Sequence, residues 1–145
     1  MIVLDTTVLV YAKGSDHPLR DPCRRIMGAV ASGEIAATTT PEVIQEFAHV
    51  RARRRDRADA ASLARDYAEI LAPLIQVGQG VLERGLGIFA ADQSVGVFDA
   101  VLIAAALEAG ASELVSADRA LADVGAIATV FPDRVAVESL LATAP

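Results

Sequence analysis

Cysteine, histidine and aromatic residues are scarce in this sequence, and each scarcity narrows what the protein can be. The single cysteine, Cys23, cannot form an internal disulfide and is expected to pack in the core. One cysteine and two histidines, His17 and His49, are too few for a typical zinc site. With aromatic residues at 4% and hydrophobic residues at 53%, the core must consist mainly of aliphatic side chains.

Long apolar runs are also missing. No stretch is long enough to cross a bilayer, and the apolar start at 1–4 meets Asp5 too early to be the core of a signal peptide. We therefore expect a cytoplasmic protein with no membrane association. The length of 145 residues suits one domain, spanning 1–145, that buries about two-thirds of its unfolded surface.

Negative charge predominates, but positive charge is concentrated. The net charge of −6 argues against a nucleic-acid partner, because binding to phosphates requires basic side chains. Five of the twelve arginines nevertheless fall between Arg51 and Arg57, whereas the acidic residues are scattered along the chain. This distribution is compatible with a phosphate-binding surface.

Short apolar runs alternate with segments of helical length. Strands are expected at 2–4, 35–37, 74–77 and 113–116, with a last one at 128–131 or 135–137. Helices are expected at 18–31, 40–55, 59–72, 81–91, 97–109 and 118–123. Because strands alternate with helices and some are apolar on both faces, the pattern predicts an α/β fold around a mainly parallel sheet.

Three aspartates are predicted to meet at one edge of that sheet. The functional crevice of an open parallel sheet lies beyond the carboxyl ends of its strands. Asp5 and Asp118 follow the strands expected at 2–4 and 113–116. Asp99 lies in the first turn of an otherwise apolar helix, where an uncompensated carboxylate is costly. A bound cation and the helix dipole would both compensate it.

The helix expected at 40–55 supplies a fourth acid and a row of arginines. Glu46 borders the apolar stripe that should face the core, and Glu42 shares its flank as a rival. Arg53 lies two turns beyond Glu46, roughly 10 Å along the axis, and Arg57 is expected on the same flank. A carboxylate and two cations would then line one wall of a groove.

Carboxylates without cysteine ligands or a histidine pair favour a hard cation, Mg²⁺ or Mn²⁺, at this edge. The substrate should then be a phosphate ester. Arg53 and Arg57 are the candidates for binding it, whereas Arg51 and Arg55 are expected to face solvent on the other side of the helix.

Four segments occur in an order and spacing that resemble the PIN-domain family, and most closely its VapC-type toxins of bacterial toxin–antitoxin pairs. The segments are IVLDTTVLV at 2–10, TTPEVIQEF at 39–47, FDAVLIAAA at 98–106 and LVSADRAL at 114–121. Each motif alone is weak, but four acids in the right order are fairly specific.

The resemblance implies an α/β/α sandwich and a metal-dependent endoribonuclease that uses Mg²⁺, or Mn²⁺, to activate a water. It assigns the metal-binding, catalytic positions to Asp5, Glu46, Asp99 and Asp118, and matches Ser116 to the Ser or Thr before the last acid. It also implies an RNA substrate that is cleaved to leave a 5′-phosphate, a small cognate antitoxin and a homodimer.

Other functions are compatible with parts of the same pattern. A housekeeping RNA-processing nuclease, or a catalytically inactive RNA-binding PIN module, would carry the same fold. Hydrolases that form an aspartyl-phosphate need a second acid two residues after the first, where this chain has Thr7. They also need a lysine late in the sheet, whereas the only lysine here is Lys13, so that class is excluded.

Overall fold

A four-stranded parallel sheet forms the centre of the computed structural model, which describes residues 1–143. The strands are β1 (Ile2–Leu4), β2 (Ala37–Thr38), β3 (Glu113–Val115) and β4 (Thr129–Val130), in the order β2-β1-β3-β4. β1 lies between β2 and β3, with Ile2 beside both Ala37 and Glu113. All strands are parallel, so their carboxyl ends share one edge.

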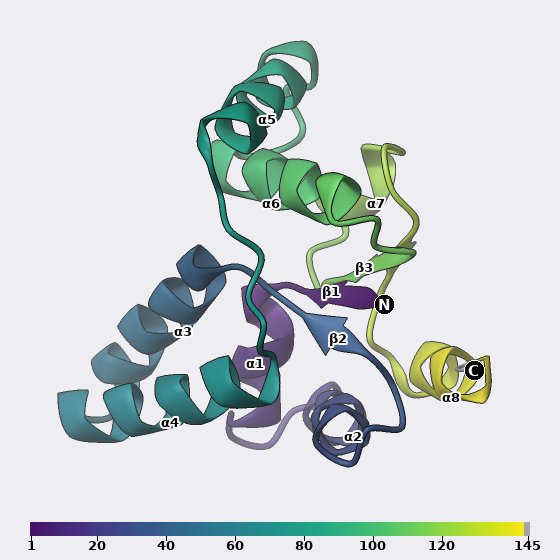
Figure 1. Cartoon of the computed structure of the whole chain (residues 1–145). Coiled ribbons are helices and arrows are strands. Elements are labelled where there is room, and N and C mark those ends of the chain that lie inside the picture. Colours follow the sequence, from purple (N-terminus) through teal and green to yellow (C-terminus); the bar gives the residue numbers. More distant parts are fainter. Residues whose placement is uncertain (144–145) are drawn as a thin grey trace.

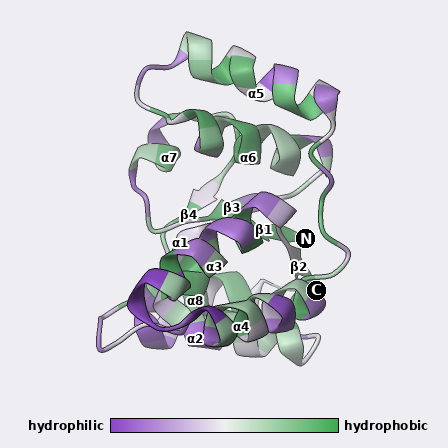
Figure 2. Cartoon of the chain, turned by 90° about the vertical axis from the view of Figure 1, so that its left-hand side faces the viewer, coloured by the Kyte–Doolittle hydropathy of each residue, from purple (hydrophilic) through white to green (hydrophobic). Residues whose placement is uncertain are grey.

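Helices cover both faces of the sheet, which confirms the predicted α/β/α sandwich (Figures 1 and 2). One face carries α1 (Thr6–Ala12), α2 (Arg20–Ala31), α3 (Pro41–Arg54), α4 (Arg57–Ile70) and α8 (Arg134–Ala142). The other face carries α6 (Val97–Glu108) and α7 (Ala120–Asp123), with α5 (Gln79–Ala91) outside α6. Within residues 1–143, no helix combines the length and the apolar character that crossing a membrane requires.

The helix α1 was not predicted, although it places the first acid. Its first five residues include four β-branched side chains, which are weak helix formers. Asp5 caps the helix by accepting a hydrogen bond from the Thr7 N–H, and Val8 and Leu9 are completely buried. A capping aspartate was the one local signal for this helix, and burial supplies the rest of its stability.

Two expected strands are wrong. The segment 74–77 contributes one backbone hydrogen bond, from the Ile75 N–H to the Thr39 carbonyl (2.9 Å), and otherwise connects the two helical layers. The segment 135–137 lies in the first turn of α8, where the Asp133 side chain accepts from the Ala136 N–H. Of the two alternatives for the last strand, the one at 128–131 is confirmed as β4.

The core follows the aliphatic composition. α6 buries residues around its whole circumference, among them Leu102, Ile103 and three consecutive alanines, as its apolar sequence predicted. Cys23 is completely buried on α2, and burial raises the pKa of its thiol to about 12. The thiol therefore stays protonated and acts as a packing group.

Gly85 sets the distance between α5 and α6. A Cβ atom at this position would lie 2.6 Å from the Cα of Val101, a backbone atom of α6. Gly87, on the same helix, has open space at the corresponding position. The two glycines therefore differ in packing and share the same secondary structure.

We expect Gly85→Ala to destabilise the protein by about 1–3 kcal/mol, because α6 would have to move away from α5. Gly87→Ala is the matched control and should stabilise by up to about 1 kcal/mol through helix propensity. Urea denaturation monitored by circular dichroism measures both changes. Equal effects of the two substitutions would show that α5 and α6 are not held in close contact at Gly85.

Candidate active site

A groove of about 400 Å³ opens at the carboxyl edge of the sheet and brings the four predicted acids together. Asp5 follows β1, Asp118 follows β3, Asp99 lies in the first turn of α6, and Glu46 lies on α3. Its lining residues are Asp5, Thr6, Thr7, Val10, Tyr11, Glu46, Val50, Arg54, Asp99 and Asp118. Residues from four separate parts of the chain thus share one surface.

Asp5 is the most firmly held of the acids. It is 4% exposed, and its Oδ2 atom accepts hydrogen bonds from the hydroxyls of Thr7 (2.6 Å) and Ser116 (2.7 Å). The Thr7 N–H adds a longer bond of 3.3 Å as the helix cap. A buried carboxylate needs such donors, because an unpaired charge away from water is costly.

The two hydroxyls also join the ends of β1 and β3. The Thr7 Oγ1 atom accepts from the Ala117 N–H (2.9 Å), and the Ser116 Oγ atom accepts from the Asp118 N–H (3.0 Å). Ser116 therefore contacts Asp5 through its proton and the Asp118 backbone through its oxygen. It lies behind the groove, where it positions two acids, and it does not line the groove itself.

Glu46, not its rival Glu42, belongs to the groove. Its Oε2 atom accepts a hydrogen bond of 2.5 Å from the Thr6 hydroxyl, and the side chain lines the cavity with the aspartates. Glu42 does not line this cavity, and its Oε2 atom is buried without a hydrogen-bond partner among residues 1–143. Of the two glutamates, the groove therefore contains Glu46.

Asp99 is the acid whose ionisation is most opposed. Burial raises the pKa of its carboxyl to about 6, and the negative charges of Asp5, Asp118 and Glu46 add to the increase. The carboxylate lies in the first turn of α6, where the dipole favours negative charge, but burial and, to a smaller extent, the neighbouring carboxylates outweigh that effect.

The donor set suits a hard divalent cation. Four carboxylates face the groove, and no histidine or cysteine lines it, which is the chemistry that Mg²⁺ and Mn²⁺ prefer. A cation would also relieve the crowding that raises the pKa of Asp99. In the part of the chain that the structure describes, no three such side chains already stand close enough together to hold a metal ion.

The arginine that lines the groove is Arg54, and not the predicted Arg53 or Arg57. Arg54 follows Glu46 and Val50 on the i, i+4, i+8 ridge of α3, and all three line the cavity. Arg53 is exposed on α3 and lies outside the groove lining. The groove follows the ridge through Val50, which is half-buried.

The placement of Arg57 on the Glu46 flank is wrong, because α3 ends at Arg54 and Arg57 begins α4. Asp56 breaks the continuity by capping α4 through the Asp59 N–H. Arg51 does not line the acidic groove, but it is not free in solvent either, because its Nε atom donates to the Asp59 carboxylate.

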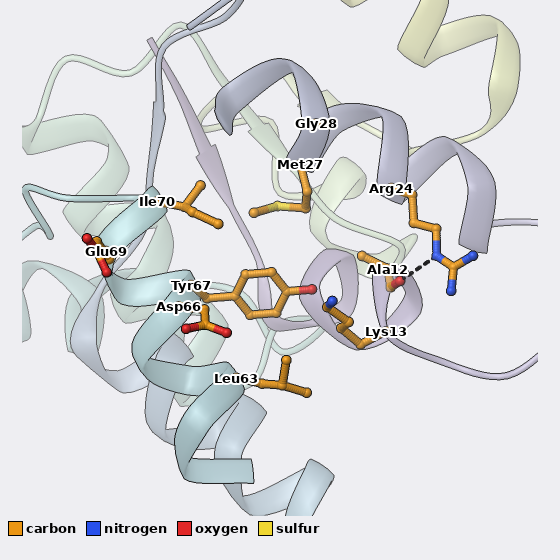
Figure 3. A pocket seen from close by; sticks show the side chains of 10 residues that line it. All are labelled: Ala12, Lys13, Arg24, Met27, Gly28, Leu63, Asp66, Tyr67, Glu69 and Ile70. Carbon is orange, nitrogen blue, oxygen red and sulfur yellow. Dashed lines mark hydrogen bonds between the residues drawn. The ribbon is translucent and has the colours of Figure 1, made fainter. Parts of the chain in front are cut away.

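A larger cavity, of about 640 Å³, lies away from the acids between the end of α1, α2 and α4 (Figure 3). Tyr67 crosses it, and its hydroxyl donates to the Leu9 carbonyl (3.4 Å). None of the four acids lines this cavity. The larger of these two cavities is therefore not the one that contains the four acids.

Comparison with known proteins agrees with this geometry, since residues 2–127 match the PIN domain family. Ribonuclease VapC7 of Mycobacterium tuberculosis (strain ATCC 25618 / H37Rv) is 54% identical over 145 residues, covering 97% of this chain and 98% of that protein. This chain is a VapC-type member of the PIN-domain family. Ribonuclease VapC23 of Mycobacterium tuberculosis (strain CDC 1551 / Oshkosh) is 38% identical over 73 residues, 48% of this PIN protein and 58% of the relative.

The raised pKa of Asp99 makes the stability of the metal-free PIN domain depend on pH. The folded carboxyl has a pKa of about 6, against 3.8 for an ordinary aspartate, so the folded state binds more protons between these values. The contribution of Asp99 to the free energy of unfolding is therefore greatest at acidic pH and is lost as pH rises towards 6.

Asp99→Asn should remove that contribution. In EDTA, the variant should lose less stability than the wild type between pH 4 and about pH 7, because an amide does not titrate. Thermal melts at several pH values measure the difference, and Asp123→Asn, an exposed acid outside the groove, is the control. Parallel curves for wild type and Asp99→Asn would contradict the raised pKa of the Asp99 carboxyl.

Proposed function

We propose that this protein is an endoribonuclease that hydrolyses RNA phosphodiester bonds at the acidic groove with Mg²⁺ or Mn²⁺. The observation that carries the proposal is the convergence of Asp5, Glu46, Asp99 and Asp118 on one groove of a PIN-domain fold. The relative that matches almost end to end is named a ribonuclease, which supports RNA as the substrate.

The residues divide into ligands and positioning groups. Asp5 at the end of β1 and Asp99 at the start of α6 would hold the cation, with Glu46 and Asp118 completing the oxygen donors directly or through water. The bound cation would supply an activated water and charge stabilisation for the leaving oxygen. Thr6, Thr7 and Ser116 orient the carboxylates through the hydrogen bonds described above.

Cleavage should depend on Asp99 and on the metal. Asp99→Asn should lower the rate of RNA cleavage by at least about 100-fold. Removing a residue that only hydrogen-bonds a metal ligand costs up to about 100-fold, and removing a ligand should cost at least as much. EDTA should abolish cleavage, and Mg²⁺ or Mn²⁺ should restore it. Mapping the ends of a fluorescently labelled cellular RNA measures all of these effects, and the products should carry a 5′-phosphate.

The matched control is Asp123→Asn, which makes the same chemical change on the exposed end of α7 and should cleave like the wild type. Undiminished cleavage by Asp99→Asn, or cleavage in EDTA, would overturn the proposal. A protein that binds RNA but never cleaves it would instead be the inactive RNA-binding module.

We further propose that the ribonuclease is the toxin of a toxin–antitoxin pair, acts in the cytoplasm and is inhibited by a small cognate antitoxin. The support is the VapC name of the relatives together with the resemblance of all four motifs. A homodimer is proposed on the same resemblance. On the outer face of α5, Leu82, Leu86 and Phe89 are 43%, 43% and 45% exposed, which provides an apolar surface for such a contact.

Expression of the wild-type chain alone should arrest growth, and Asp99→Asn, accumulating to the same level, should not. Co-expression of a small protein encoded directly upstream should relieve the arrest, because the antitoxin would occupy the groove. Colony counts after induction, with immunoblots for protein level, measure this. Normal growth at high levels of active wild-type enzyme would favour a housekeeping RNA-processing nuclease.

A further inference from the structure

A second pocket, of about 220 Å³, adjoins the acidic groove and has the opposite charge. The two share Val10, Val50 and Arg54 as lining residues, so one surface runs from the carboxylates into this pocket. The basic pocket is formed by the end of α1 and the end of α3, and its lining residues are Val10, Lys13, Gly14, Ser15, Phe47, Val50, Arg51, Arg54 and Arg55.

Three of its four cations are available to a ligand. Within residues 1–143, no carboxylate lies within ion-pair distance of Lys13, Arg54 or Arg55. Arg51 is different, because both its Nε and Nη2 atoms bond the Asp59 carboxylate, at 2.5 and 3.3 Å. Asp59 does not line the pocket.

Arg51 builds the pocket. Besides its pair with Asp59 on α4, its Nη1 atom donates to the Lys13 carbonyl at 3.2 Å, across the α1–α3 contact. Lys13 is the residue that ends α1. Arg51 therefore holds the backbone of Lys13 against α3, so that the lysine and Arg54 lie in the same pocket wall.

We propose that this basic pocket binds a backbone phosphate of the RNA strand next to the one held at the acidic groove. Lys13 and Arg54 would contact the phosphate, with Arg55 adding positive charge and Arg51 acting as a positioning residue. The inference rests on the proposed ribonuclease function, because the phosphate in the basic pocket is defined as the neighbour of the phosphate that is cleaved at the acidic groove.

The shape and charge favour a nucleic-acid strand. A strand whose phosphate reaches the carboxylates must continue out of the groove, and the shared wall leads it past Val10 and Val50 to the cations. The apolar pair between the two charged ends suits a sugar or base, whereas the ends suit phosphates. The net charge of −6 makes such a local cluster necessary for any phosphate ligand.

Equilibrium binding tests the pocket without cleavage. A short fluorescein-labelled oligouridine is titrated against protein carrying Asp99→Asn, with Lys13→Ala or Arg54→Ala added. Each substitution should weaken binding by roughly tenfold and reduce the slope of log K against log salt by about one. Thermal melts should be unchanged, because neither side chain makes an ion pair within residues 1–143.

Arg53→Ala is the matched control, since it removes the same charge from the same helix outside both pockets. It should leave the affinity and the salt slope unchanged. If Arg53→Ala acts like Arg54→Ala, or if Lys13→Ala and Arg54→Ala have no effect, the pocket is not a phosphate site. Displacement of the RNA by polyglutamate as effectively as by unlabelled oligouridine would assign the pocket to an acidic protein segment instead.

A cleavage assay then locates the phosphate. In an RNA with a mapped cut, neutral methylphosphonates replace single linkages on either side of it. Replacement of one linkage close to the cut should raise KM for the wild type. The same replacement should not raise KM in Arg54→Ala, because the contact to that phosphate is already lost. Equal effects in both proteins at every linkage would overturn the proposal. Absence of any cleavage would count against the ribonuclease function alone, because the binding titration still reports on the pocket.

Discussion

Repulsion among four carboxylates in one groove is the constraint on which the rest of this structure depends. Asp5, Glu46, Asp99 and Asp118 come from distant parts of the chain, and nothing in their own chemistry holds them together. The parallel sheet holds Asp5 and Asp118 close together, because burying β1 between β2 and β3 brings the carboxyl ends of β1 and β3 side by side. The stability of the core thus compensates for an electrostatically unfavourable edge.

The electrostatic cost of placing a negative charge at this edge differs among the acids. Asp5 receives two hydroxyl donors and a backbone N–H, so its charge is compensated by the protein itself. Asp99 has burial and three negative neighbours, and its pKa rises accordingly. The two aspartates therefore differ: Asp5 is part of the framework that joins β1 to β3, whereas Asp99 is the position where burial and the neighbouring carboxylates most oppose ionisation.

The sequence predicts the sheet edge well because its signals there are local. An apolar run followed by Asp5, and another followed by Asp118, suffice once the fold is parallel. The arginine assignment could not be made in the same way. Choosing Arg54 over Arg53 requires knowing which ridge of α3 borders the groove, and the break before α4 depends on Asp56 capping. The Asp56 cap is a local signal, but the choice of ridge is set by tertiary packing, as is the burial that makes a helix of the β-branched residues in α1.

That short helix also fixes a length. Asp5 stands at its beginning and Lys13 at its end, so the acidic and basic ends of the surface are separated by eight residues of helical rise, about 12 Å. Helix length changes only in whole residues, and each residue added would also rotate Lys13 by about 100° around the axis. The length of α1 thus sets the distance between the acidic groove and the proposed phosphate pocket, and relatives with a longer or shorter first helix would place these two surfaces at a different separation.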